Sequence, residues 1–178
     1  MIDNKEKNFV SAVVYVRNDE QCVHQFLLAL NQTLANNFEK YEIVCVNDDS
    51  DDRSALLIKE FAKSVKNAAV SLVNMSFYQG VELSMNAGID LAIGDFVFEF
   101  DHAYMDYEAD TIMKVYKRSL EGYDIVAAAP TKVEQYTSRI FYFLFNRFSG
   151  SHYPLRTEAF RVLSRRVINR VHSMSKTI

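Results

Sequence analysis

Residues 41–52, YEIVCVNDDSDD, join a run of strand-forming side chains to a cluster of polar and acidic ones. The β-branched and aromatic residues at 41–46 predict a buried strand. The residues at 47–52 predict a turn, because Ser and Asp side chains accept hydrogen bonds from the free N–H groups that begin a helix. A strand that runs straight into a helix is the repeating unit of a parallel sheet.

The same strand-and-helix unit recurs on both sides of this stretch. Further strands are expected at residues 9–16, 69–75, 95–100 and 123–129, and helices at 21–38, 55–65, 81–92 and 111–120. The helical ranges carry apolar residues at a spacing of three and four, which predicts helices packed on a sheet. We therefore predict an α/β fold with a mostly parallel central sheet flanked by helices.

The pattern changes after Pro130. Residues 135–148 contain the aromatic run IFYFLF and predict a helix, and residues 157–174 predict a short extended piece leading into a basic helix. IFYFLF is too short to span a membrane, and it suits either a membrane interface or a buried core helix. We expect a polar lead at residues 1–8, a single domain at 9–178, and a membrane-associated region after residue 178.

Charge is distributed unevenly along the 178 residues. The first 130 hold 11 Lys and Arg against 21 Asp and Glu, whereas residues 131–178 hold 9 against 2. The basic tail predicts an anionic partner, which is the phosphate of a sugar nucleotide, the phosphate of a lipid or an anionic membrane face. Cys22 and Cys45 lie in apolar patterns and predict buried thiols, so we expect a reducing, cytoplasmic setting at the inner face of a membrane.

Several common site patterns are missing from the sequence. The turn after residues 9–16 has no glycine, no G-x-x-x-x-G-K-[ST] occurs, and no His and Cys residues have zinc-site spacing. No arrangement of Ser, His and Asp indicates a nucleophile. Ligands of open parallel sheets bind beyond the carboxyl ends of the strands, which leaves Asp48 and Asp101 as the candidates for chemistry.

The order of these motifs resembles the inverting family 2 glycosyltransferases with the GT-A fold. SAVVYVRNDE resembles their V-V-I-P-V-Y-N-E, and IVCVNDDSDD resembles their V-D-D-G-S-x-D. FYQGVELSMNAGIDLAIGDFVFEFDHA resembles the long N-x-G to D-x-D stretch that follows. RIFYFLFNRFSG and AFRVLSRRVI look like the matching stretches of polyprenyl-phosphate sugar transferases such as dolichyl-phosphate mannose synthase. Four weak motifs in the right order make a strong signal together.

The resemblance implies a nucleotide site and a GT-A nucleotide-diphospho-sugar transferase fold. Tyr15 and Arg17 would border the base, Asp48 would accept from the base or ribose, and Asn86 would line the pocket. The competing interpretation is that residues 48–50 only cap the next helix, and that Gly88 serves close packing. The donor would be a UDP- or GDP-linked sugar, with a lipid-phosphate or cell-surface saccharide acceptor; nothing points to nucleic acid.

Asp101 matches the first aspartate of the family's D-x-D and is the implied catalytic residue. In the family these carboxylates hold Mg²⁺ or Mn²⁺ against the sugar diphosphate. Here Ala103 stands at the second aspartate and Met105 stands where Gln is usual. His102 is a candidate nitrogen ligand beside Asp101, although a lone His in a loop is more often a surface residue.

The basic tail departs from the family at one position. The family's D-F-R appears as Ala159-Phe160-Arg161, and a shift to Glu158 on an extended segment is expected to turn the carboxylate to the other face. Arg161 and Arg165 are candidate phosphate contacts, because guanidinium forks match phosphate oxygens; a solvated helix face is the alternative. An acceptor that is already ionised, such as a lipid phosphate, needs no base.

Three hypotheses follow for the function. The first is a family 2 glycosyltransferase of cell-envelope polysaccharide biosynthesis that is membrane-associated. The second is a catalytically impaired nucleotide-sugar-binding or regulatory relative, because Ala103 and Ala159 replace aspartates. The third is a receiver-like signalling domain, which ranks last because receivers place their acid pair after the first strand.

Overall fold

The computed structural model describes residues 5–129 and 158–175. Its elements follow the order β1 (Val10–Val16), α1 (Val23–Asn37), β2 (Tyr41–Asn47), α2 (Ser54–Ser64), β3 (Ala69–Asn74), α3 (Val81–Leu91), β4 (Phe96–Phe100), α4 (Thr111–Leu120), β5 (Ile125–Ala128), β6 (Phe160–Ser164) and α6 (Arg165–Ser175). The predicted segment 135–148 lies outside the described residues. The other predicted elements are confirmed, with small differences at their ends.

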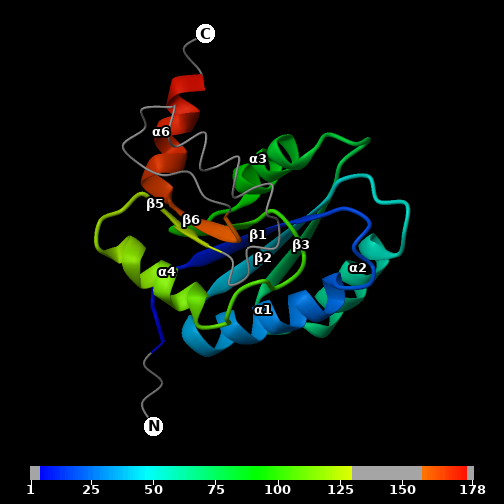
Figure 1. Cartoon of the computed structure of the whole chain (residues 1–178), viewed down its shortest axis with the longest axis horizontal. Coiled ribbons are helices and arrows are strands. Elements are labelled where there is room, and N and C mark those ends of the chain that lie inside the picture. Colours follow the sequence, from blue (N-terminus) through cyan, green and yellow to red (C-terminus); the bar gives the residue numbers. More distant parts are fainter. Residues whose placement is uncertain (1–4, 130–157, 176–178) are drawn as a thin grey trace, which may run out of the picture.

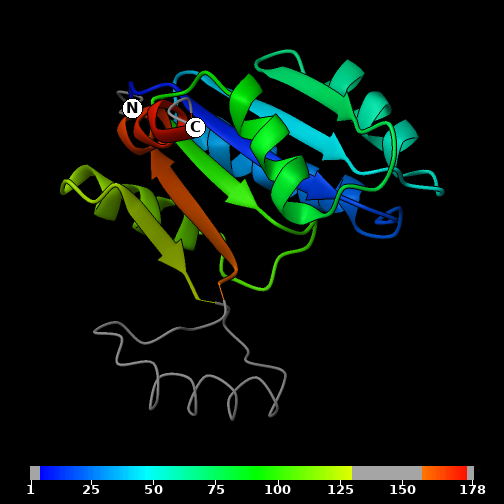
Figure 2. The same cartoon turned by 90° about the horizontal axis from the view of Figure 1, so that it is seen from above.

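The strands form one six-stranded sheet in the order β3-β2-β1-β4-β6-β5 (Figure 2). β1 pairs in parallel with β2 and β4, and β2 pairs in parallel with β3. β6 is inserted between β4 and β5 and is antiparallel to both. The carboxyl ends of β1, β2 and β4 therefore share one edge, whereas β6 begins at that edge and runs away from it.

Helices cover both faces of the sheet, which makes three layers (Figure 1). α1, α2 and α4 pack on one face through a core that includes Phe26, Phe61 and Tyr116. α3 and α6 lie on the other face over a smaller core that includes Met85, Ile89 and Ile168. Because β1 and β2 are fully buried along their length, the continuous apolar runs of the sequence are explained by cover on both sides.

Two glycines let backbone and side chains approach more closely than any other residue allows. A Cβ at Gly88 of α3 would lie 2.4 Å from Cγ1 of Val13 and 2.8 Å from Cγ2 of Val46. A Cβ at Gly94 would lie 2.6 Å from the backbone N of Ser11. The packing interpretation of Gly88 is confirmed, since α3 sits on β1 and β2 only because this position has no side chain.

The turn at residues 47–52 does not cap α2 in the predicted way. The N-cap position is Arg53, which has no side-chain cap hydrogen bond. Asp52 Oδ1 accepts instead from the backbone N of Ser54, at 2.9 Å. The Asp48 carboxylate bonds elsewhere, so the interpretation of Asp48 as a cap of this helix is wrong.

Candidate functional site

Asp48 is the buried centre of the sheet edge at which β1 and β2 end. Its side chain is 0% exposed. Its Oδ1 accepts from the backbone N of Gln79 at 2.8 Å, and its Oδ2 accepts from the backbone N of Gly80 at 2.9 Å and from the hydroxyl of Tyr15 at 3.0 Å. This carboxylate therefore ties β1, β2 and the loop before α3 together.

Hydrogen bonding keeps the Asp48 carboxylate ionised. Burial acts to raise the pKa of Asp48, but the hydrogen bonds from Gln79, Tyr15 and Gly80 outweigh it and lower the pKa below its usual value. The same contact acts on Tyr15 in the opposite direction. Burial and the neighbouring Asp48 carboxylate raise the pKa of the Tyr15 hydroxyl, so it remains a donor at neutral pH.

Arg17 completes this group from the end of β1. Its Nη1 donates to the backbone oxygen of Asp48 at 2.6 Å, and its guanidinium lies 4.0 Å from the ring centre of Tyr78. Asp49 has a φ of +54°, in the left-handed region that favours glycine, at the place where the resembled motif has Gly. The structure thus brings Tyr15, Arg17 and Asp48 together at one edge.

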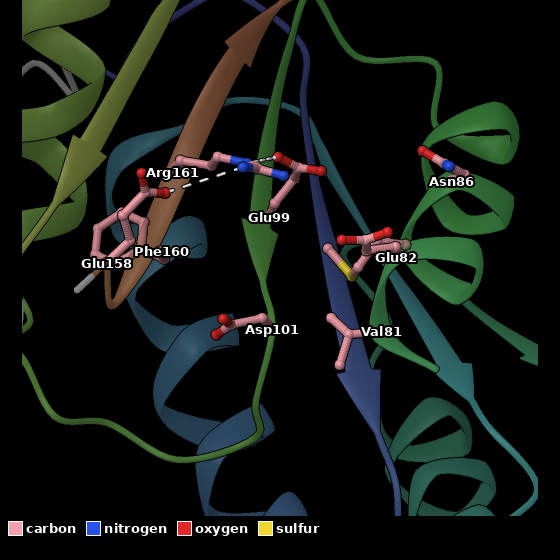
Figure 3. A pocket seen from close by; sticks show the side chains of 9 residues that line it. Val81, Glu82, Asn86, Glu99, Asp101, Glu158, Phe160 and Arg161 are labelled. Carbon is pink, nitrogen blue, oxygen red and sulfur yellow. Dashed lines mark hydrogen bonds and ion pairs between the residues drawn. The ribbon is translucent and has the colours of Figure 1, made fainter. Parts of the chain in front are cut away.

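A cavity of about 430 Å³ opens beside this edge, between α3, β4 and the start of β6 (Figure 3). It is lined by Val81, Glu82, Met85, Asn86, Glu99, Asp101, Glu158, Phe160 and Arg161. Asn86, Glu99 and Arg161 also line a second, more apolar cavity of about 480 Å³ that extends toward α6. Because Val81 follows the Gly80 that Asp48 holds, the Asp48 network fixes one wall of the first cavity.

Asp101 follows directly after β4 and its side chain is 55% exposed. Its Oδ1 lies 2.5 Å from Nδ1 of His102, whose Nε2 lies 3.6 Å from Oδ1 of Asp106. Burial acts to lower the pKa of His102, but the Asp101 and Asp106 carboxylates outweigh it and raise the pKa above its usual value. The ring of His102 therefore lies between two carboxylates that favour its protonated form.

The residues around Asp101 offer few ligands for Mg²⁺ or Mn²⁺. Within residues 5–129 and 158–175, no group of three or more His, Cys, Asp and Glu side chains is placed to hold a metal ion. Ala103, at the second aspartate of the pattern, is 0% exposed in the core and offers no oxygen ligand, and Nδ1 of His102 is already in contact with Asp101. These side chains do not fit a divalent cation by themselves, and we assign no step to one.

Glu99 and Arg161 form an ion pair inside the cavity (Figure 3). Arg161 Nε donates to Oε2 of Glu99, and Arg161 Nη1 lies 4.0 Å from Oε2 of Glu158. Glu158 lines the cavity, whereas Ala159 is 1% exposed in the core. Glu158 and Ala159 thus face opposite sides, as expected for neighbouring residues of an extended segment, but the side that faces the cavity is that of Glu158.

Arg165 does not join the cavity. Its Nε and Nη2 donate to the backbone oxygens of Gly94 and Ala92, at 2.7 to 2.9 Å. These oxygens precede β4, roughly 20 Å along the strand from Asp101. Because β6 is antiparallel to β4, Arg165 lies at the opposite edge of the sheet from Asp101, away from the predicted phosphate site. Arg166 likewise pairs with Asp124 at 2.8 Å.

Among the charged residues that line the cavity, Glu82 and Glu99 had no predicted role, and Glu158 entered only as the neighbour of the missing aspartate. For Glu99 a signal was present, since it is the one charged side chain within the apolar run FVFEF. A charge in a buried strand requires a partner. The identity of that partner, Arg161, follows only from the pairing of β4 with β6.

Comparisons with known proteins agree with this geometry. Residues 11–172 match the family model described as Glycosyl transferase family 2. An uncharacterised glycosyltransferase of Synechocystis sp. is 31% identical over 93% of this chain and 53% of its own length. The undecaprenyl-phosphate 4-deoxy-4-formamido-L-arabinose transferase of Proteus mirabilis is 30% identical over 67% of this chain and 36% of its own. The chain spans about half the length of the first of these relatives.

Solved structures share the fold. A mannosyltransferase from Pyrobaculum calidifontis, solved with GDP-Man and Mn²⁺, has a TM-score of 0.70 at 20% identity and covers 93% of this chain and 47% of its own. The glucosyl-3-phosphoglycerate synthase of Mycobacterium tuberculosis, solved with Mn²⁺, UDP and phosphoglyceric acid, has a TM-score of 0.63 at 13% identity and covers 90% and 57%. The predicted GT-A fold is confirmed.

Proposed function

Because this chain belongs to glycosyl transferase family 2, we propose that it transfers a sugar from a nucleoside diphosphate donor to a lipid-phosphate acceptor, with inversion at the anomeric carbon. The observation that carries this proposal is the cavity that places Asp101 and Arg161 beside the loop held by Asp48. Relatives named as undecaprenyl-phosphate transferases support a lipid phosphate over a saccharide acceptor. The family match leaves no support for the receiver-like hypothesis.

Each part of the site has a role in this reaction. The nucleotide lies at the edge formed by Tyr15, Arg17 and the loop at Gln79 and Gly80. Asp48 holds this loop in place by hydrogen bonds to its backbone. The donor sugar occupies the first cavity, where Asn86 and the carboxylates accept hydrogen bonds from its hydroxyl groups. Arg161 binds phosphate oxygens from the β6 side.

The chemistry follows from charge. An acceptor oxygen attacks the anomeric carbon from the face opposite the diphosphate; the new C–O bond forms as the bond to the diphosphate oxygen breaks, and the nucleoside diphosphate leaves with that electron pair. Positive charge develops on the sugar ring in glycosyl transfer. A carboxylate at Asp101 stabilises that charge in a partly enclosed site. A phosphate acceptor is already an anion and gives up no proton.

The impaired-relative hypothesis rested on Ala103 and Ala159, and the structure weakens its basis. Both side chains are buried in the core, so they do not face the cavity. Asp101 and Glu158 supply carboxylates at the cavity instead.

None of the helices within residues 5–129 and 158–175 is long and apolar enough to cross a membrane. We propose that the protein works at the inner face of a membrane, reaching its lipid acceptor from that side.

Calorimetry with a panel of UDP- and GDP-linked sugars tests the donor class. We expect either the UDP-linked or the GDP-linked sugars to bind, and the other series to bind with an affinity at least tenfold lower, with or without Mn²⁺. Titrations with ATP serve as the control for unspecific phosphate binding. Absence of binding by every nucleoside diphosphate in the panel would overturn the proposed function.

The variant Asp101→Asn tests the reaction itself. Asn keeps the shape of the side chain and removes its charge, so we expect transfer of a labelled sugar to undecaprenyl phosphate to fall roughly 100-fold, or about 2.7 kcal/mol of activation free energy, while donor affinity changes little. Asp106→Asn, in the same loop, serves as the matched control. Transfer at the wild-type rate by Asp101→Asn would show that this carboxylate takes no part.

A further inference from the structure

Glu99 is a buried carboxylate in β4, a strand whose other side chains are all apolar. It is 4% exposed, and its neighbours Phe98 and Phe100 face the core on the other side of the sheet. A buried carboxylate without a partner costs several kcal/mol. Its charge is matched by Arg161, whose Nε donates to Oε2.

The backbone sets this pair. Glu99 on β4 and Arg161 on β6 are direct cross-strand partners in the antiparallel ladder. Their side chains therefore lie opposite each other on neighbouring strands, within reach of direct contact. Arg161 nonetheless lines the cavity with a side chain that is 48% exposed, so Glu99 holds its Nε while the guanidinium stays open to solvent.

Competing carboxylates surround the same guanidinium. The hydrogen bond to Glu99 is the largest influence that raises the pKa of Arg161, and the charges of Glu158 and Asp101 add to it. A long Arg side chain loses rotamer freedom on binding a ligand unless it is already held in place. Nη1 already lies 4.0 Å from Oε2 of Glu158, and without the contact to Glu99 the fork is free to turn further toward Glu158 or Asp101 and away from a ligand.

We propose that Glu99 is a positioning residue that holds Arg161 by its Nε, so that the two terminal nitrogens face the Asp101 cavity and bind phosphate oxygens of a substrate. This inference rests on the proposed function and adds a residue to it. The phosphate belongs either to the donor diphosphate or to the lipid acceptor, since both present the same oxygens to a guanidinium fork.

A double-mutant cycle on ligand affinity tests this role. We expect Glu99→Ala and Arg161→Ala each to weaken the same phosphate ligand about tenfold, and the double variant to be no weaker than either single variant. Glu99→Gln, whose amide oxygen still accepts from Nε, should stay within about threefold of wild type. UDP or GDP alone reports on the donor phosphate, and undecaprenyl phosphate in detergent micelles reports on the acceptor.

Glu42→Gln provides the matched control. Glu42 is also a buried carboxylate on a central strand, but it accepts from the Ser11 hydroxyl and the Ile93 backbone N, at the opposite end of the sheet. Its substitution should alter stability and leave both affinities unchanged. If Glu99→Ala and Glu99→Gln alter only the melting temperature, or the two alanine effects add, Glu99 is structural and the inference fails. If wild type binds neither ligand, the proposed function fails first.

Discussion

Asp48→Ala is expected to lower the free energy of unfolding by about 3 kcal/mol, because three buried donors lose their acceptor at once. The backbone N–H groups of Gln79 and Gly80 and the hydroxyl of Tyr15 all point at this carboxylate. The loop before α3 should detach from β2, and nucleotide affinity should fall with it. Urea unfolding at pH 7 measures the first effect and calorimetry measures the second.

The loss of stability caused by Asp48→Ala should depend on pH. The folded-state pKa of Asp48 is below its unfolded value of about 3.9. A carboxyl of this kind contributes stability that is present above the unfolded pKa and is lost as pH falls through the folded pKa. The stability difference between wild type and Asp48→Ala should therefore be largest near neutral pH and shrink below about pH 4.

Asp51→Ala is the control for this experiment, since Asp51 lies in the same turn with an exposed side chain. We expect its effect to stay within about 0.5 kcal/mol. An Asp48→Ala variant as stable as Asp51→Ala would contradict the view that Asp48 holds the edge of the sheet.

Gly94→Ala is expected to cost about 3 kcal/mol or more, although Gly94 lies outside both cavities. The added Cβ would lie 2.6 Å from the backbone N of Ser11 and 2.8 Å from the backbone carbonyl carbon of Val10. Backbone atoms of a central strand cannot move aside as a flexible side chain does, so β1 or β4 must shift. Thermal unfolding monitored by circular dichroism measures the loss.

Gly122→Ala separates crowding from backbone strain. Gly122 has a φ of +102°, but a Cβ there would meet nothing within 4 Å. Its substitution should cost about 1 to 2 kcal/mol through the unfavourable φ alone. A smaller loss for Gly94→Ala than for Gly122→Ala would mean that β1 and β4 have room that the structure does not indicate.

Local pattern predicted the fold well where neighbours in sequence are neighbours in space. The parallel direction of β1, β2, β3 and β4 follows from alternating strands and helices, and it places Asp48 and Asp101 at one edge as expected. The direction of β6 did not follow, because residues 130–157 separate it from β5. An antiparallel strand begins at the edge where its parallel neighbours end. This explains why Arg161, at the start of β6, reaches the cavity and Arg165, after its end, does not.

The site was predictable only in part for a related reason. Motifs identify which residues lie at the end of a strand, and this suffices to place Tyr15, Arg17, Asp48 and Asp101 at one edge of the sheet. Pairs formed across strands, such as Glu99 with Arg161, depend on register, which no local pattern specifies. The inward turn of Ala159 and the outward position of Glu158 depend on where β6 begins, a boundary of one or two residues.

The start of β6 lies directly beside the end of β5, and the backbone N of Ala159 donates to the oxygen of Ala128 at 2.8 Å. The chain therefore leaves the sheet and returns to it at a single point next to the cavity. Doubling the length of such an insertion costs only about 0.6 kcal/mol in closure entropy. The length of the chain between β5 and β6 can therefore change at little cost to the sheet.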